Sequence, residues 1–146
     1  MKIVKFVVGV FGALVCLVVY LWLRPPSVVL YSYEDLVGVT CATLSQRHEE
    51  VITSHHDAAL DYFHRKGEFP LGLGLPPEEH LPFALLLQRY VQDEALQGFD
   101  VSQPFRPTAS PLHAQFDAEV SRVCALYPEI LAWDAGHEAA RRLKLR

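Results

Sequence analysis

The chain of 146 residues contains no asparagine, and it therefore offers no acceptor for N-glycosylation. It also lacks the common catalytic signatures. Gly72 and Gly74 have no third glycine and no preceding strand, and neither a P-loop nor a Gly-x-Ser-x-Gly elbow occurs. A serine–histidine–aspartate triad is defined by geometry that a sequence does not give. We therefore expect no enzyme, no catalytic residue, no cofactor and no small-molecule substrate.

Positive charge is scarce outside the N-terminus. Lys2, Lys5 and Arg24 flank the first apolar run, which leaves 10 basic against 17 acidic side chains in residues 27–146, a formal charge of −7. Nucleic-acid binding depends on basic side chains that neutralise phosphates. We therefore expect no nucleic-acid partner.

The N-terminal segment carries almost no charge. Residues 6–23 are 18 uncharged, mostly apolar residues, which as a helix would measure about 27 Å against roughly 30 Å of bilayer hydrocarbon. Tyr20 and Trp22 stand where an interfacial aromatic belt is expected. No small-x-small cleavage site follows, and Pro25 and Pro26 make a poor one. We predict an uncleaved signal anchor over residues 1–24, which contacts the lipid bilayer through residues 3–23; a cleaved signal peptide is the alternative.

The flanking charges predict the orientation of this anchor. Lys2, Lys5 and the amino terminus precede the run, whereas Arg24 after it is soon offset by Glu34 and Asp35. The positive-inside bias then places the N-terminus in the cytoplasm and exports the rest. An excess of arginine over lysine is compatible with a bacterial protein. We predict a single-pass protein of the bacterial inner membrane with its C-terminal domain in the periplasm.

Hydrophobic periodicity predicts an all-α domain over residues 32–146, after a linker at residues 25–31. Four or five helices are expected around one core. Ser-x-x-Asp at residues 32–35 begins a short helix, and the main helices are expected at residues 40–66, 78–97, 111–127 and 128–145. Gly67 and Gly98 should end the first two main helices, and Pro82 delays the start of the second. The one candidate strand is residues 28–33.

The three cysteines divide by location. Cys16 lies in the apolar run, and Cys41 and Cys124 lie in the exported part. Two cysteines in an oxidising compartment predict one disulfide, Cys41–Cys124. In the chain-entropy model a loop of this length stabilises by about 4 to 5 kcal/mol, an upper figure. Two buried thiols in a cytosolic domain are the alternative.

Four histidines fall in the helix predicted at residues 40–66. His48 and His55 lie along its apolar stripe, where protonation of an imidazole would cost free energy, and they are our candidates for pH sensing. Partly buried histidines without such a role, or a metal-binding face, are the alternatives. We expect no metal, since no pair has i, i+4 spacing with a carboxylate beside it. His137-Glu138 fails the zinc-protease pattern at Arg141.

Two local patterns resemble the HdeA-like family of small periplasmic helical proteins. One is Thr40-Cys41 at the start of a helix, and the other is residues 120–128, a helix that ends Cys-x-x-x-Pro, followed by residues 130–135. The resemblance implies helices tied by one disulfide and, from the best-known members, an acid-stress chaperone that loosens at low pH and binds unfolded clients. The family's cysteines lie closer together in sequence, and its members are released by a cleaved signal.

These observations favour a membrane-anchored periplasmic helical domain that binds protein. The partner is an unfolded client if the domain is an HdeA-like acid-stress chaperone. It is a toxin if the domain is an immunity protein against a periplasm-acting toxin, and the acidic charge would suit a basic toxin. A His-based metal-binding protein is the third alternative.

Overall fold

The computed structural model describes residues 2–24, 27–72 and 74–145, and the side chains of residues 2–9 lie outside the described part. Within it the chain is helical and contains no strand, which confirms the all-α prediction. The elements are α1 (Lys2–Leu23), α2 (Tyr33–Leu36), α3 (Cys41–Lys66), the 3₁₀ turn η1 (Glu78–His80), α4 (Pro82–Asp93), α5 (Pro111–Leu126) and α6 (Ala132–Arg142).

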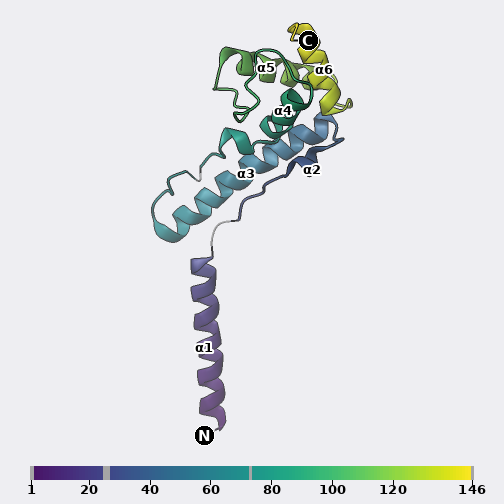
Figure 1. Ribbon diagram of the computed structural model, residues 1–146. Helices are drawn as coiled ribbons and strands as arrows, with labels where there is room; N and C mark the ends of the chain where they lie inside the picture. Colours follow the sequence, from purple (N-terminus) through teal and green to yellow (C-terminus); the bar gives the residue numbers. More distant parts are fainter. Residues whose placement is uncertain (1, 25–26, 73, 146) are drawn as a thin grey trace.

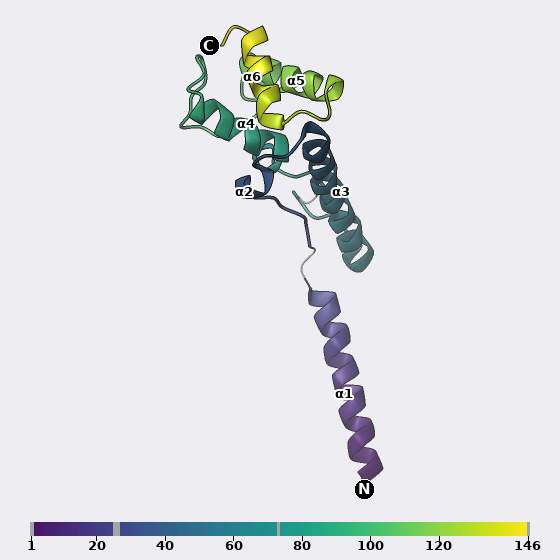
Figure 2. The ribbon, with the colours of Figure 1, turned by 90° about the vertical axis from the view of Figure 1, so that its right-hand side faces the viewer.

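Helix α1 projects away from the other helices, which form a separate body above it (Figures 1 and 2). Its described side chains, from Val10 to Leu23, are all exposed. Within the described residues, no helix combines the length and the apolar character that crossing a membrane requires. Part of the predicted span falls on residues 3–9, whose side chains lie outside the described part, and the span stays a prediction.

Helix α3 has the limits that its capping residues predict. The Thr40 hydroxyl accepts a hydrogen bond from the Thr43 amide at 3.3 Å, as an N-cap does. At the other end Gly67 adopts φ 76°, which favours glycine, and its amide donates to the Phe63 carbonyl. Ser110 caps α5 in the same way as Thr40 caps α3, since its hydroxyl accepts from the His113 amide.

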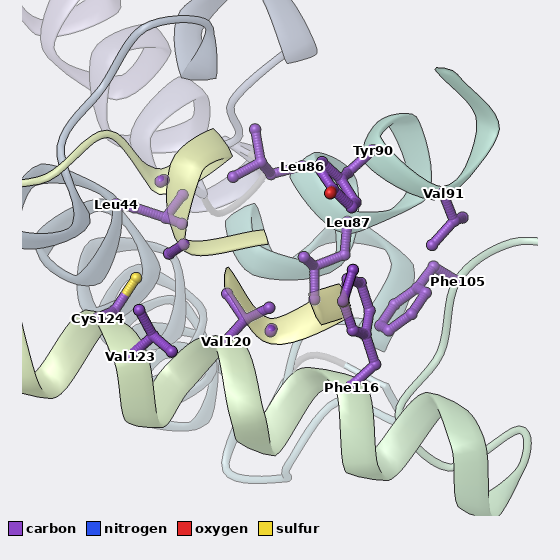
Figure 3. Close-up of a cluster of buried hydrophobic side chains, with 14 of the residues drawn as sticks. Leu44, Leu86, Leu87, Tyr90, Val91, Phe105, Phe116, Val120, Val123 and Cys124 are labelled. Atoms are coloured by element: carbon purple, nitrogen blue, oxygen red, sulfur yellow. The ribbon is translucent and has the colours of Figure 1, made fainter. Parts of the chain in front are cut away.

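The core lies where α4, α5 and α6 meet α2 and the first turns of α3 (Figure 3). Tyr90 is at its centre and is 1% exposed. Its ring contacts Phe116 and Trp133, and its hydroxyl lies 2.9 Å from His137 Nδ1. A Cβ at Gly136 would approach the Tyr90 ring to 3.0 Å, so glycine lets α6 lie close against this ring.

The disulfide between Cys41 and Cys124 is present, with the two Cα atoms 5.0 Å apart. It joins the first residue of α3 to the last turn of α5, as predicted. The α5–α6 connection reinforces this joint, because the Cys41 amide donates to the Ile130 carbonyl at 2.9 Å and the Ala42 amide donates to the Pro128 carbonyl at 2.8 Å. These are first-turn amides that have no acceptor within their own helix.

The same joint corrects the predicted start of the last helix. Pro128 does not begin it; α6 starts at Ala132, because residues 128–130 form a turn whose Pro128 and Ile130 carbonyls accept hydrogen bonds from the first amides of α3. The second helix is also shorter than predicted. It ends at Asp93, where Ala95 turns into the left-handed region at φ 48° and Leu96 enters the core.

The candidate strand at residues 28–33 does not form. Residues 27–32 run extended beside α3 and pair with its side chains. The Val29 amide donates to the Ser54 hydroxyl at 2.9 Å, and the Tyr31 hydroxyl donates to the Glu50 carboxylate. A single chain segment beside a helix has no strand partner, which is why the predicted strand is absent here.

Replacing both cysteines, as Cys41→Ala with Cys124→Ala, should lower the free energy of unfolding by up to about 4 kcal/mol, because the unfolded chain regains the freedom of an 83-residue separation. Denaturant unfolding of the full chain followed by circular dichroism measures this. The control is Cys16→Ser, an exposed thiol whose removal should leave the midpoint unchanged. Equal midpoints for the double variant and the control would contradict the structural role of the bridge.

Candidate functional site

A pocket of about 300 Å³ opens between α3, α4 and α5. This pocket brings His48, one of the two predicted pH-sensing residues, together with other polar side chains. Its lining residues are Ser45, His48, Glu49, Phe83, Asp117, Ser121 and Ala125.

His48 is half-buried in this pocket, and its ring lies edge-on against Phe83 with the centroids 5.3 Å apart. The Nδ1 atom is buried and has no hydrogen-bond partner among the described residues. Burial lowers the pKa of His48 below its ordinary value of 6.5, and the Glu49 carboxylate opposes that shift. The pocket therefore favours the neutral ring.

Asp117 faces the same pocket from α5. Burial raises the pKa of Asp117 above its ordinary value of 3.8, and the Glu78 carboxylate adds to the shift. The pocket thus disfavours charge both on His48 and on Asp117.

The two groups act on stability in opposite directions as the pH changes. The folded pKa of His48 is lowered, so its contribution is present above pH 6.5 and is lost as the pH falls through the folded pKa. The folded pKa of Asp117 is raised, so its contribution is present below pH 3.8 and is lost as the pH rises through the folded pKa. Mild acid therefore weakens the pocket through His48 while it relieves Asp117.

His55, the second predicted pH-sensing residue, lies elsewhere. It is 5% exposed, and its Nδ1 is 2.9 Å from the Val51 carbonyl oxygen one turn earlier in α3. A carbonyl only accepts hydrogen bonds, so Nδ1 of this ring carries a proton. The structure does not bring His55 and His48 together, since His55 does not line the pocket of His48.

In the described part of the chain, the pocket does not show the contacts of a catalytic triad. A catalytic triad needs both nitrogens of its histidine engaged, one by a carboxylate and one by a hydroxyl, whereas His48 Nδ1 has no partner. In the described part of the chain, no group of three or more His, Cys, Asp or Glu residues is placed to hold a metal ion. The pocket thus brings a histidine and a carboxylic acid to one junction of three helices.

Sequence reasoning missed Asp117 and Phe83. Asp117 directly follows the stripe residue Phe116, so the helical period alone put it at the edge of the buried face. The half-buried position of α5 that faces α3 depends on how the two helices cross, and no local sequence pattern predicts that crossing. The buried His113 was missed as well; it stacks on Phe105 with the ring centroids 4.7 Å apart.

A second surface feature lies at the disulfide end of the domain. Two loops meet there through a hydrogen bond from the Ala132 amide to the Val39 carbonyl and through the Thr40–Leu131 bridge. Four large apolar side chains on or beside these loops are exposed by 43–57%. We call them the distal patch: Val37, Leu126, Tyr127 and Leu131.

No protein-family model, no curated protein and no solved structure matches this chain. The resemblance to HdeA-like proteins therefore stays a prediction.

Replacing His48 with glutamine should flatten the fall in stability between pH 6.5 and 4, because the neutral amide has no proton to gain while the burial site stays filled. Denaturant midpoints of the full chain across this range measure the effect. His56→Gln is the matched control, since His56 is exposed on the same helix. A slope that His48→Gln leaves unchanged would assign the acid sensitivity to other groups.

Replacing Asp117 with asparagine should stabilise the domain at pH 7, where a carboxylate with a raised pKa is charged at a cost in the folded state. The gain should shrink as the pH falls and vanish below pH 3.8, where the wild-type side chain is protonated in both states. Thermal unfolding at pH 7 and pH 3.5 checks both limits. Asp57→Asn, at an exposed position of α3, should show neither effect.

Proposed function

We propose that this chain is a membrane-anchored, exported helical domain that binds protein and loosens in acid, as an acid-stress chaperone does. The observation that carries the proposal is the buried, unpartnered Nδ1 of His48 at the junction of α3, α4 and α5. A proton taken up there weakens the contact of α3 with α4 and α5. Phe83, which packs on His48, is then released to solvent.

The disulfide sets the limit of this loosening. Cys41 and Cys124 keep the start of α3 attached to α5 whatever the state of the pocket. Acid therefore separates helices that remain tethered, and the domain can close again when the pH rises. A bridge of this kind also suits an oxidising compartment such as the periplasm.

Anchoring to the bacterial inner membrane is supported by the first helix. Helix α1 is 22 residues long, its described side chains are exposed, and its sequence from residue 6 to residue 23 carries no charge. An apolar surface of that kind is stable in lipid and unfavourable in water. The positive-inside bias places the helical domain on the outer side of that membrane.

The distal patch is our candidate for the first protein contact. It exposes Leu126, Tyr127 and Leu131 already at neutral pH. Aliphatic and tyrosine side chains of this kind form the centre of many protein interfaces. The immunity-protein alternative uses the same patch, and the acidic charge of the domain supports it, because a basic toxin would be attracted.

The full chain, reconstituted in vesicles, should keep an acid-unfolded test protein soluble at pH 4 and not at pH 7. The variant His48→Gln should lose a large part of this protection, because it no longer loosens. Light scattering of the test protein measures it. A chain that protects equally at both pH values, or not at all, would contradict the chaperone form; neutral-pH binding to a single partner would favour the immunity alternative.

The control for this experiment tests whether protection depends on the distal patch or on any exposed apolar side chain. Leu126→Ser with Leu131→Ser should reduce protection several-fold without lowering the midpoint of unfolding, since both side chains are exposed. Val101→Ser removes an equally exposed apolar side chain elsewhere in the domain and should have no effect.

A further inference from the structure

The C-terminal ends of α1 and α3 are joined by one arginine. Arg65 Nη1 donates to the Trp22 carbonyl at 3.1 Å and to the Arg24 carbonyl at 2.8 Å. The carbonyls at the end of a helix lack partners within it, and a cation there also complements the helix dipole. In both views this end of α3 is the part of the domain nearest to α1 (Figures 1 and 2).

Other cations gather at the same level. Lys66 Nζ lies 3.1 Å from the centroid of the Trp22 ring, and Arg24 directly follows α1. Trp22 is the type of residue that marks a membrane–water interface, and lysine and arginine side chains there reach toward lipid headgroups. Asp61, which pairs with Arg65 at 2.8 Å, and the exposed Glu68 are the acids nearby.

Beyond these cations the chain turns and exposes two large apolar side chains. Phe69 is 64% exposed and stacks on Phe63 of α3, with the ring centroids 4.4 Å apart. Leu71 is fully exposed, at 104%. Exposed apolar side chains grouped in this way mark a contact surface, and nothing in the described part of the chain covers Leu71.

We propose that Phe69 and Leu71 enter the headgroup region of the same bilayer that holds α1, with Lys66 and Arg24 against anionic phospholipid headgroups. The inference rests on the anchoring proposed above. A lipid surface is the occupant that fits, because Arg65 holds this turn beside the point where α1 would leave the membrane. Apolar tips flanked by cations are the chemistry of interfacial membrane contacts.

This contact gives the domain a second attachment to the bilayer. Without it, the domain is held to α1 by the contacts of Arg65 and Lys66. With Phe69 and Leu71 embedded, the C-terminal end of α3 stays at the membrane and the distal patch, at its other end, points away from the membrane.

The test uses the full chain with Cys16→Ser and Leu71→Cys, so that a fluorophore labels position 71 alone. The protein is reconstituted in vesicles of phosphatidylcholine and phosphatidylglycerol that contain a lipid-borne spin-label quencher. The matched control carries the label at Val101, an apolar residue 48% exposed on the connection between α4 and α5. Alkaline carbonate washing of the same vesicles reports whether α1 anchors the chain.

We expect several-fold stronger quenching at position 71 than at position 101, and we expect Phe69→Ser to reduce quenching at 71 while helix content stays the same. Protein that resists the carbonate wash yet shows equal quenching at both positions would overturn this inference and leave the anchoring intact. Protein that the wash extracts would overturn the anchoring and this inference with it.

Discussion

The arrangement of the domain depends on the joint at the start of α3. There the Cys41–Cys124 bridge joins the start of α3 to the end of α5. Hydrogen bonds from the Cys41 and Ala42 amides join the same turn of α3 to the α5–α6 connection. The first-turn amides of a buried helix need acceptors, and the α5–α6 connection supplies them. This explains why residues 128–130 form a turn and why α6 begins only at Ala132. It also brings α6 over Tyr90, where Gly136 leaves room for the ring.

Acid acts unevenly on a domain built in this way. The α5–α6 pair is held by Arg142, which reaches Glu119 at 3.2 Å and Glu138 at 2.5 Å. Hydrogen bonds from Arg141, the larger cause, and from Arg142 lower the pKa of Glu138 to about 2. The stability from this carboxylate is present above its ordinary pKa of 4.5 and is lost only as the pH falls through about 2. The Glu138 ion pairs lie within α6, and the link to α5 is Arg142–Glu119. Hydrogen bonds from Arg122 and Arg142 lower the pKa of Glu119 below its ordinary value of 4.5, so this link is lost only below that pH, whereas the stability from His48 begins to fall at pH 6.5.

Local signals in the sequence predicted most of the helices. Thr40 and Gly67 bound α3, and Ser110 begins α5, because capping depends on residues next to each helix end. The predictions were wrong where contacts between distant segments determine where a helix ends. Helix α4 ends early because Leu96 enters the core and the Gln97 amide donates to the Leu145 carbonyl, 48 residues along the chain.

The residues of the candidate site were likewise only partly predictable from the sequence. The disulfide was predictable, since Cys41 and Cys124 are the two cysteines outside the apolar N-terminal run and leave a single pairing. His48 and His55 were correctly placed on the apolar side of α3, but the sequence could not tell them apart. Only His48 meets a neighbouring helix with an unpaired nitrogen, and its companion Asp117 comes from α5, 69 positions away.

The length of α3 has a consequence for how partners are met. Its 26 residues measure about 39 Å, and the body of the domain gathers around its first turns (Figure 1). On the anchoring proposed above, the length of α3 would limit how far from the membrane the domain can contact another molecule. Encounters with partners would then take place close to the membrane surface, where tethering of both molecules raises their effective concentration.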